Sequence, residues 1–319
     1  MSRTSSFRAI AAALVALWCG ALQAQTYPTK PITILISTAP GGSLDLMARV
    51  AAAHFEKKWG QTAVVEARPG GGGIVALTQV VRAPADGHTL ALSGSPMTTT
   101  LFVKDIPFDS FKDVTGVSLI GLLAYQLQVS RAVNVRTLKE FVAHAKANPG
   151  KLTLGAVAPG THELEVRSLE QALGFTGNVI PYKGIAPIWL ALIANQLDAT
   201  LSASTPPQQK TGEILALAVG GEKRNPAYPE VPTFREQGVQ HDPVASYYVL
   251  THGATPRPVL NQISTELTAV AKSAEFDARV TKTISIVGVG ASVDAANQYM
   301  RNEYERLKKV ADAAKIVPQ

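Results

Sequence analysis

The sequence has a single cysteine among its 319 residues, and only 17% of the residues are charged. That cysteine, Cys19, lies in an N-terminal segment that we predict to be removed, so the remaining chain would carry no thiol. Disulfides, thiolate catalysis and cysteine-based metal sites are thereby excluded from the mature chain. A lipid anchor needs a small residue before the cysteine, and Trp18 stands there, so we expect no lipoprotein anchor.

A strong net charge is also missing. The chain has 30 basic and 24 acidic residues, and losing Arg3 and Arg8 with the N-terminal segment leaves 28 and 24. The basic residues are scattered and form no run with interleaved aromatic residues, so we expect no nucleic-acid partner. The small positive balance favours anionic solutes only weakly.

Familiar catalytic, metal and nucleotide motifs are absent. No lysine follows Gly42 as a P-loop requires, and Val75 stands where a dinucleotide fingerprint begun in Gly70–Gly73 needs glycine. His162 begins like a zinc-protease helix, but Val166 replaces its second histidine. We recognise no nucleophile–base pair. We therefore predict a protein that is not an enzyme and has no cofactor and no metal site; an exported hydrolase is the rival hypothesis.

The N-terminus has a clear targeting pattern. Arg3 and Arg8 precede an apolar run over residues 9–21, and Ala24 offers a small residue for cleavage before Gln25. This layout is typical of a secretory signal peptide, which we place at residues 1–24. The run is shorter than the roughly 20 residues that span a bilayer, so we expect the mature chain not to cross a membrane. The alternatives are a retained anchor and a buried N-terminal helix.

Strand-like and helix-like segments alternate along the rest of the chain. We expect strands at 32–37, 63–66, 89–92, 152–157, 179–180, 197–201, 214–219, 246–250 and 284–289, and helices at 44–59, 73–82, 137–149, 163–173, 187–195, 258–272 and 295–314. Repeated strand–helix–strand units predict an α/β protein with parallel sheets covered by helices on both faces. The length suits two domains. Because no low-complexity linker separates them, we expect strands to cross between the two.

Two expected strands end in nearly the same tripeptide, and each leads directly into a helix. The tripeptides are Ala39-Pro40-Gly41 and Ala158-Pro159-Gly160. A helix start leaves about four N–H groups without partners and carries roughly half a positive charge. Glycine lets a guest approach closely, so each turn can hold a carboxylate without a basic side chain. The alternative is a pair of ordinary turns capped by Ser43 and Thr161.

Six segments, in order, resemble those of the Bug family, the periplasmic binding proteins of tripartite tricarboxylate transporters. They cover residues 27–32, 39–45, 68–73, 86–90, 181–184 and 231–238. The resemblance implies a periplasmic, two-lobed Venus-flytrap protein of the type II kind, each lobe a sheet flanked by helices. It implies lobe I at 25–124 plus 251–319, lobe II at 125–250, and a monomer. It also implies a small carboxylate ligand that is passed to separate membrane subunits; a receptor that feeds a signalling system is the alternative.

The resemblance further implies which residues bind the ligand, partly through ordered water. They are Pro40, Gly41, Gly42, Ser43, Asp45, Ser93, Ser95, Ala158, Gly160, Thr161, Tyr182, Gly184, Ser202 and Ser204. Asp45 could instead only favour the first turn of its own helix. The chain departs from the family at residues 156–159, where Ala-Val-Ala-Pro replaces the usual Ser–Ser–Gly. The family often has an acidic residue near Ser202, and its absence here predicts a ligand without an amino group.

Overall fold

The computed structural model describes residues 27–203, 206, 208–225 and 228–318. The predicted signal peptide, with Cys19, and the predicted site residue Ser204 lie outside the described residues. In the described part of the chain, no helix is both long and apolar enough to cross a membrane.

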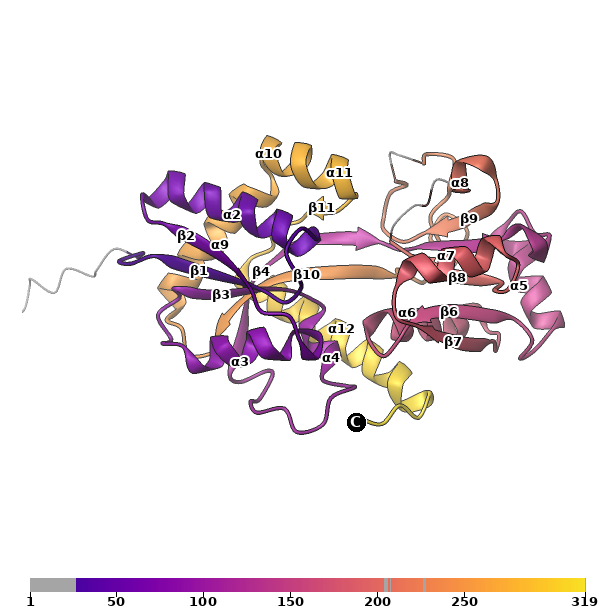
Figure 1. Ribbon diagram of the computed structural model, residues 1–319, viewed down its shortest axis with the longest axis horizontal. Helices are drawn as coiled ribbons and strands as arrows, with labels where there is room; N and C mark the ends of the chain where they lie inside the picture. The colour runs from indigo at the N-terminus through magenta and orange to yellow at the C-terminus, as the bar shows by residue number, and fades with distance from the viewer. Residues whose placement is uncertain (1–26, 204–205, 207, 226–227, 319) are drawn as a thin grey trace, which may run out of the picture.

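The first lobe is built on a six-stranded sheet with the order β11-β4-β10-β3-β1-β2 (Figure 1). Its strands are β1 (Ile32–Ile36), β2 (Ala63–Ala67), β3 (Thr89–Gly94), β4 (Val114–Ala124), β10 (Val244–His252) and β11 (Val287–Gly288). The strands β1, β2 and β3 are parallel, whereas β10 runs antiparallel to both β3 and β4. The carboxyl ends of β1 and β3 therefore lie at the same edge of the sheet.

Helices cover both faces of this sheet. They are α2 (Ser43–Trp59), α3 (Ile74–Arg82), α4 (Pro96–Thr99), α9 (Arg257–Ala271), α10 (Ala274–Phe276), α11 (Lys282–Ile284) and α12 (Val293–Ala313). Neighbouring residues of β1 point to opposite faces. Ile34 packs with Met47 of α2, whereas Leu35 packs with Met300 of α12. Burial on both faces explains why β1 is apolar except at Thr33.

The second lobe has a five-stranded sheet with the order β7-β6-β8-β5-β9. Its elements are β5 (Gln126–Ser130), α5 (Leu138–Ala147), β6 (Thr153–Val157), α6 (Thr161–Leu173), β7 (Asn178–Tyr182), α7 (Ile185–Ile193), β8 (Ala199–Ser202), α8 (Gln208–Thr211) and β9 (Ile214–Val219). Phe141, Leu169 and Phe234 belong to one of its cores, and Ile188 and Leu192 belong to another. The strands β6, β7 and β8 are parallel, so their carboxyl ends meet at one edge.

Two chain crossings join the lobes, and both pass Tyr125. Tyr125 alone separates β4 from β5. Its N–H donates to Pro243 O at 2.9 Å, and its carbonyl accepts from Gly220 N at 2.8 Å. A Cβ on Gly220 would lie 2.3 Å from Pro243 O, so only glycine fits this close crossing. The chain passes from the first sheet to the second at Tyr125 and returns between β9 and β10. The exact lobe boundaries expected from the sequence stay a prediction.

The two-lobed α/β architecture predicted from the sequence is confirmed. The expected parallel sheets are found in part: β1–β3 and β6–β8 are parallel, whereas β10 and β5, next to the points where the chain crosses between the lobes, pair antiparallel. The strand expected at 284–289 is largely wrong. Phe276 and Val280 anchor a helical segment in the core, and the helix continues to Ile284. Only Val287 and Gly288 then pair with β4.

Candidate functional site

The first predicted turn connects β1 to α2. Its helix begins after Gly42, and none of the described side chains caps it. Gly41 has φ +88°, which favours glycine. The alternative in which Ser43 caps the helix is thus wrong. The N–H group of Gly42 precedes the helix, and those of Ser43 and Leu44 have no acceptor within it, which leaves all three for a guest.

Asp45 is used within the turn itself. Its side chain is buried, and Oδ2 accepts hydrogen bonds from Gly41 N and from Arg49 Nε, each at 3.1 Å. The hydrogen bond with Arg49 lowers the pKa of Asp45 below its usual range. This carboxylate holds the turn in shape, which agrees with the local role considered from the sequence.

Three strands supply the neighbours of the first turn. Ser93 Oγ at the end of β3 lies 3.1 Å from Ser37 Oγ after β1, so the structure brings these strand ends together. Tyr247 on β10 lies beside Ser43: burial raises the pKa of this tyrosine, and the side chain of Ser43 partly opposes the shift. Ser95 is buried, and its hydroxyl donates to Glu303 of α12. The sequence did not point to Tyr247, because its place depends on the pairing of β10 opposite Gly94.

The second predicted turn connects β6 to α6. The helix begins after Gly160, which has φ +152°, and none of the described side chains caps this start either. Thr161 is therefore not the cap. Its Oγ1 lies 2.5 Å from Thr98 Oγ1 of α4. Because α4 follows β3, this contact brings the second turn against the strand ends of the first lobe.

His162 fixes the shape of the second turn. Its Nδ1 accepts from Val157 N at 2.7 Å, so its Nε2 carries the proton and donates to Leu201 O at 2.6 Å. Burial lowers the pKa of His162, which keeps the ring neutral in this arrangement. The sequence singled out His162 only as a failed metal motif, yet its ring ties α6 to both β6 and β8.

The remaining predicted residues lie at the ends of β7 and β8. Tyr182 O accepts from Ala158 N at 3.2 Å, which joins that strand end to the second turn. Ser202 ends β8 and is buried. Gly184 precedes α7, which also begins with no cap from a described side chain. Pro40 is exposed at the first turn.

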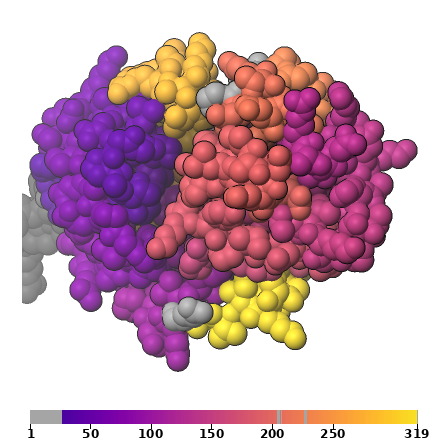
Figure 2. All heavy atoms as spheres, turned by 45° about the vertical axis from the view of Figure 1, so that its right-hand side comes forward, coloured from indigo at the N-terminus to yellow at the C-terminus, as the bar shows by residue number. Residues whose placement is uncertain are grey.

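Some helix starts in the molecule carry a side-chain cap and others do not. The helices α2, α6 and α7 begin at Gly42, Gly160 and Gly184 and lack a cap from any described side chain, as do α3, α4 and α9. By contrast, Thr137 and Ser292 cap α5 and α12 through their hydroxyls. The uncapped starts follow strand ends of both sheets, and Figure 2 shows a groove between the indigo part of the first lobe and the salmon part of the second. The arrangement leaves backbone N–H groups available to an anionic guest.

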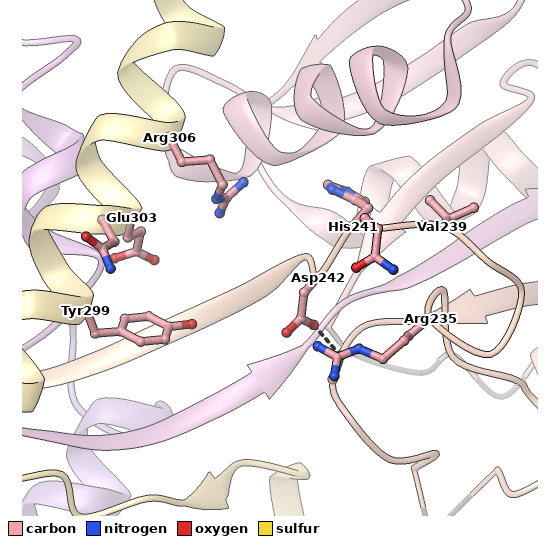
Figure 3. A pocket seen from close by; sticks show the side chains of 10 residues that line it. Arg235, Val239, His241, Asp242, Tyr299, Glu303 and Arg306 are labelled. Carbon is pink, nitrogen blue, oxygen red and sulfur yellow. Dashed lines mark hydrogen bonds between the residues drawn. The ribbon is translucent and has the colours of Figure 1, made fainter.

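A separate cavity of about 370 Å³ lies between α12 and the segment before β10 (Figure 3). Its lining includes His241, Asp242, Tyr299, Glu303 and Arg306, and none of the described predicted site residues. The described residues hold no group of three or more His, Cys, Asp or Glu side chains that could bind a metal ion. The groove and this cavity are thus two distinct features.

Comparison with known proteins gives a consistent picture. A family model described as "Tripartite tricarboxylate transporter family receptor" (TctC) matches residues 47–316. The "UPF0065 protein in gbd 5'region" of Cupriavidus necator is 35% identical over 240 residues, which is 72% of either chain. Protein BugT of Bordetella pertussis is 32% identical over 223 residues, 68% of either chain.

Solved structures agree. The periplasmic binding protein BugD is 26% identical with a TM-score of 0.70, and a protein of R. palustris solved with adipate is 28% identical with a TM-score of 0.74. Both comparisons cover 92% of this chain and 100% of the other. A TctC solute-binding protein from Polaromonas has a TM-score of 0.80 at 22% identity, covering 90% of this chain and 100% of that one; at this identity the likeness shows the fold alone.

Proposed function

Because the chain belongs to the tripartite tricarboxylate transporter family receptors, as its resemblance to the Bug family predicts, we propose that it captures a small organic carboxylate between its lobes. It then delivers the acid to separate membrane subunits. The receptors of this family are periplasmic solute-binding proteins rather than enzymes. The chain reaches the periplasm with a signal peptide over residues 1–24.

The observation that carries this proposal is the set of uncapped helix starts. The starts of α2 and α6 belong to different lobes, and the contact between Thr98 and Thr161 joins the two sides. Each start offers N–H groups and the positive end of a helix dipole. A carboxylate can therefore bind at either one without a lysine or arginine.

The ligand that fits best is a dicarboxylic acid without an amino group. Two helix starts suit two carboxylates, and the R. palustris relative was solved with adipate. A ligand ammonium would need an acidic partner near Ser202, and residues 199–212 include no aspartate or glutamate. Adipate is thus the first probe, with succinate, glutarate, glutamate and aspartate beside it.

Isothermal titration of the purified protein with these acids tests the proposal. Replacing Gly42 by proline removes one N–H at a position whose φ of −88° is close to that of proline. We expect Gly42→Pro to weaken binding by about 1.5–3 kcal/mol, as for a hydrogen bond to a charged group. The matched control is Gly42→Ala, which keeps the N–H and whose Cβ has its nearest neighbour at 3.9 Å.

Two results would contradict the proposal. One is the absence of binding to every carboxylate in the panel, and the other is equal affinity of the proline and alanine variants. Tighter binding of glutamate or aspartate than of the plain dicarboxylates would overturn the amine-free assignment. Uptake of the labelled acid by cells with and without the chain separates delivery to a transporter from a signalling role.

A further inference from the structure

The C-terminal helix α12 contacts both lobes. It packs on β4 of the first sheet, where Met300 joins the core with Leu35. Further along, Leu307 and Val310 pack against Leu164 of α6. The helix that carries the second turn of the groove therefore rests on a helix of the first lobe.

Glu303 of α12 holds the strand end beside the first turn. Its Oε1 accepts from Ser95 Oγ at 3.1 Å and from Ser246 Oγ at 2.8 Å, and its Oε2 accepts from Tyr248 Oη at 3.1 Å. Ser95 has the left-handed φ of +37°, which is unusual for serine. Ser95 N also donates to Ser246 O at 2.8 Å. One buried carboxylate thus fixes Ser95, the residue between β3 and α4.

Arg306 lies one helical turn beyond Glu303 and holds the second lobe. Its guanidinium donates to both oxygens of Glu165 on α6, at 2.5 and 3.2 Å, and to Ser168 Oγ at 3.3 Å. Glu165 is completely buried, so this bidentate pair fixes α6 with little freedom. Figure 3 shows Glu303 and Arg306 projecting from α12 toward the segment that carries His241 and Asp242.

We propose that Glu303 and Arg306 are positioning residues for the ligand groove: adjacent turns of one rigid helix hold α4 beside the first turn and α6 at the second, and so set the separation of the lobes before a ligand binds. This inference rests on the proposed function. Neither residue lies among those expected to touch ligand. Both side chains line the cavity of about 370 Å³ between α12 and the segment before β10.

Glu303 also makes the arrangement sensitive to pH. Burial and the nearby charge of Glu165 raise its pKa, the hydroxyl donors and Arg306 lower it, and the net result is a pKa of about 7. The other titratable groups around it are Tyr248 and Tyr299, with Asp242 and His241 across the cavity. Because its pKa is raised, the packed arrangement favours the protonated carboxyl, and ionisation favours a looser arrangement that water can enter. The attachment of α4 to α12 is therefore firmer at pH 6 than at pH 8.

Distances between spin labels on the two lobes test this proposal without any ligand. The labels are attached at Lys57→Cys on α2 and Lys139→Cys on α5, both exposed, in the chain without residues 1–24, which has no other cysteine. The variants are Glu303→Gln and the double variant Glu165→Gln with Arg306→Gln, which removes the buried pair without leaving a lone charge. The control is Asp294→Asn, which breaks an exposed pair between α12 and Arg257 inside the first lobe.

We expect a broader distance distribution in both variants than in the control, and a dependence on pH in the parent protein that Glu303→Gln removes. If the binding-competent arrangement falls to about a tenth of the population, the affinity for adipate falls about tenfold. Melting temperatures report any general loss of stability. Distributions unchanged from the parent in both variants, or a parent distribution indifferent to pH, would overturn the positioning role. If the parent fails to bind adipate, the proposed function is contradicted, and the distances still decide the positioning role.

Discussion

His241 and Glu303 line the same cavity, and burial shifts their pKa values in opposite directions (Figure 3). Burial lowers the pKa of His241 to about 4, and the charge of Arg306 adds to this. Its buried Nε2 has no hydrogen-bond partner among the described residues. Burial of Glu303 acts in the other direction, so the protein holds a neutral histidine beside a carboxyl that titrates near neutrality.

The pKa of His241 predicts a loss of stability in acid. The unfolded chain takes up a proton near pH 6.5, whereas the folded protein does so only near pH 4, so stability falls as the pH drops through this window. We expect His241→Gln to gain on the parent by up to about 3 kcal/mol between pH 7 and pH 4. Urea unfolding at stepped pH measures the difference, and parallel curves for the two proteins would refute it.

Glu303 predicts the opposite slope. A folded pKa of about 7 lies above the unfolded value of about 4.3, so its contribution to stability is present below pH 4.3 and is lost as the pH rises to 7. We expect Glu303→Gln to be at least as stable as the parent at pH 8 and to lose that advantage toward pH 5. If Glu303→Gln instead lost stability relative to the parent between pH 5 and pH 8, the ionised carboxylate would be favourable in the folded protein.

Some site residues could be predicted from the sequence and others could not. The two glycine turns are visible because neighbouring residues form them, and the glycines do begin the helices. Tyr247 and His162 could not be assigned roles, because each acts on residues brought close by strand pairing or by helix packing. The wall residues of the groove stay a prediction, since Ser95 and Ser202 are buried and Ser204 lies outside the described residues.

Among the elements, the capped helices provide a contrast to the groove. Ser292 Oγ accepts from Ala295 N at the start of α12. We expect Ser292→Ala to cost about 1 kcal/mol of stability, as for loss of a typical N-cap. Its affinity for carboxylates should be unchanged, since the cap is remote from the groove. Chemical denaturation and titration of the same sample check both parts, and a stability equal to that of the parent would contradict the assigned cap.

Element prediction succeeded where one physical signal dominates. Apolar runs located β1 and β9, and helical periodicity located α2, each to within a residue or two. It failed at 284–289, where apolar residues serve the core from a helical segment followed by a left-handed Ser285. β5 was missed because it follows β4 after only Tyr125, without the glycine or proline that usually separates strands.

At the scale of the whole molecule, the close crossing at Gly220 limits what the hinge can accept. A methyl group there would overlap Pro243 O at 2.3 Å, so the two crossing segments must separate. We expect Gly220→Ala to lower the melting temperature and to weaken carboxylate binding. The comparison is Gly94→Ala, whose Cβ has its nearest neighbour at 3.7 Å. Equal melting temperatures for the two variants would show that the crossing is not tightly packed.

The uncapped helix starts have a consequence for the medium in which the receptor works. None of the predicted binding residues is basic, so attraction to the ligand comes from contacts at hydrogen-bond range rather than from a field reaching into solution. Such contacts are far shorter than the screening length of about 8 Å at physiological ionic strength. Dissolved salt should therefore change the affinity for the acid less than it would change the affinity of a site built on lysine or arginine.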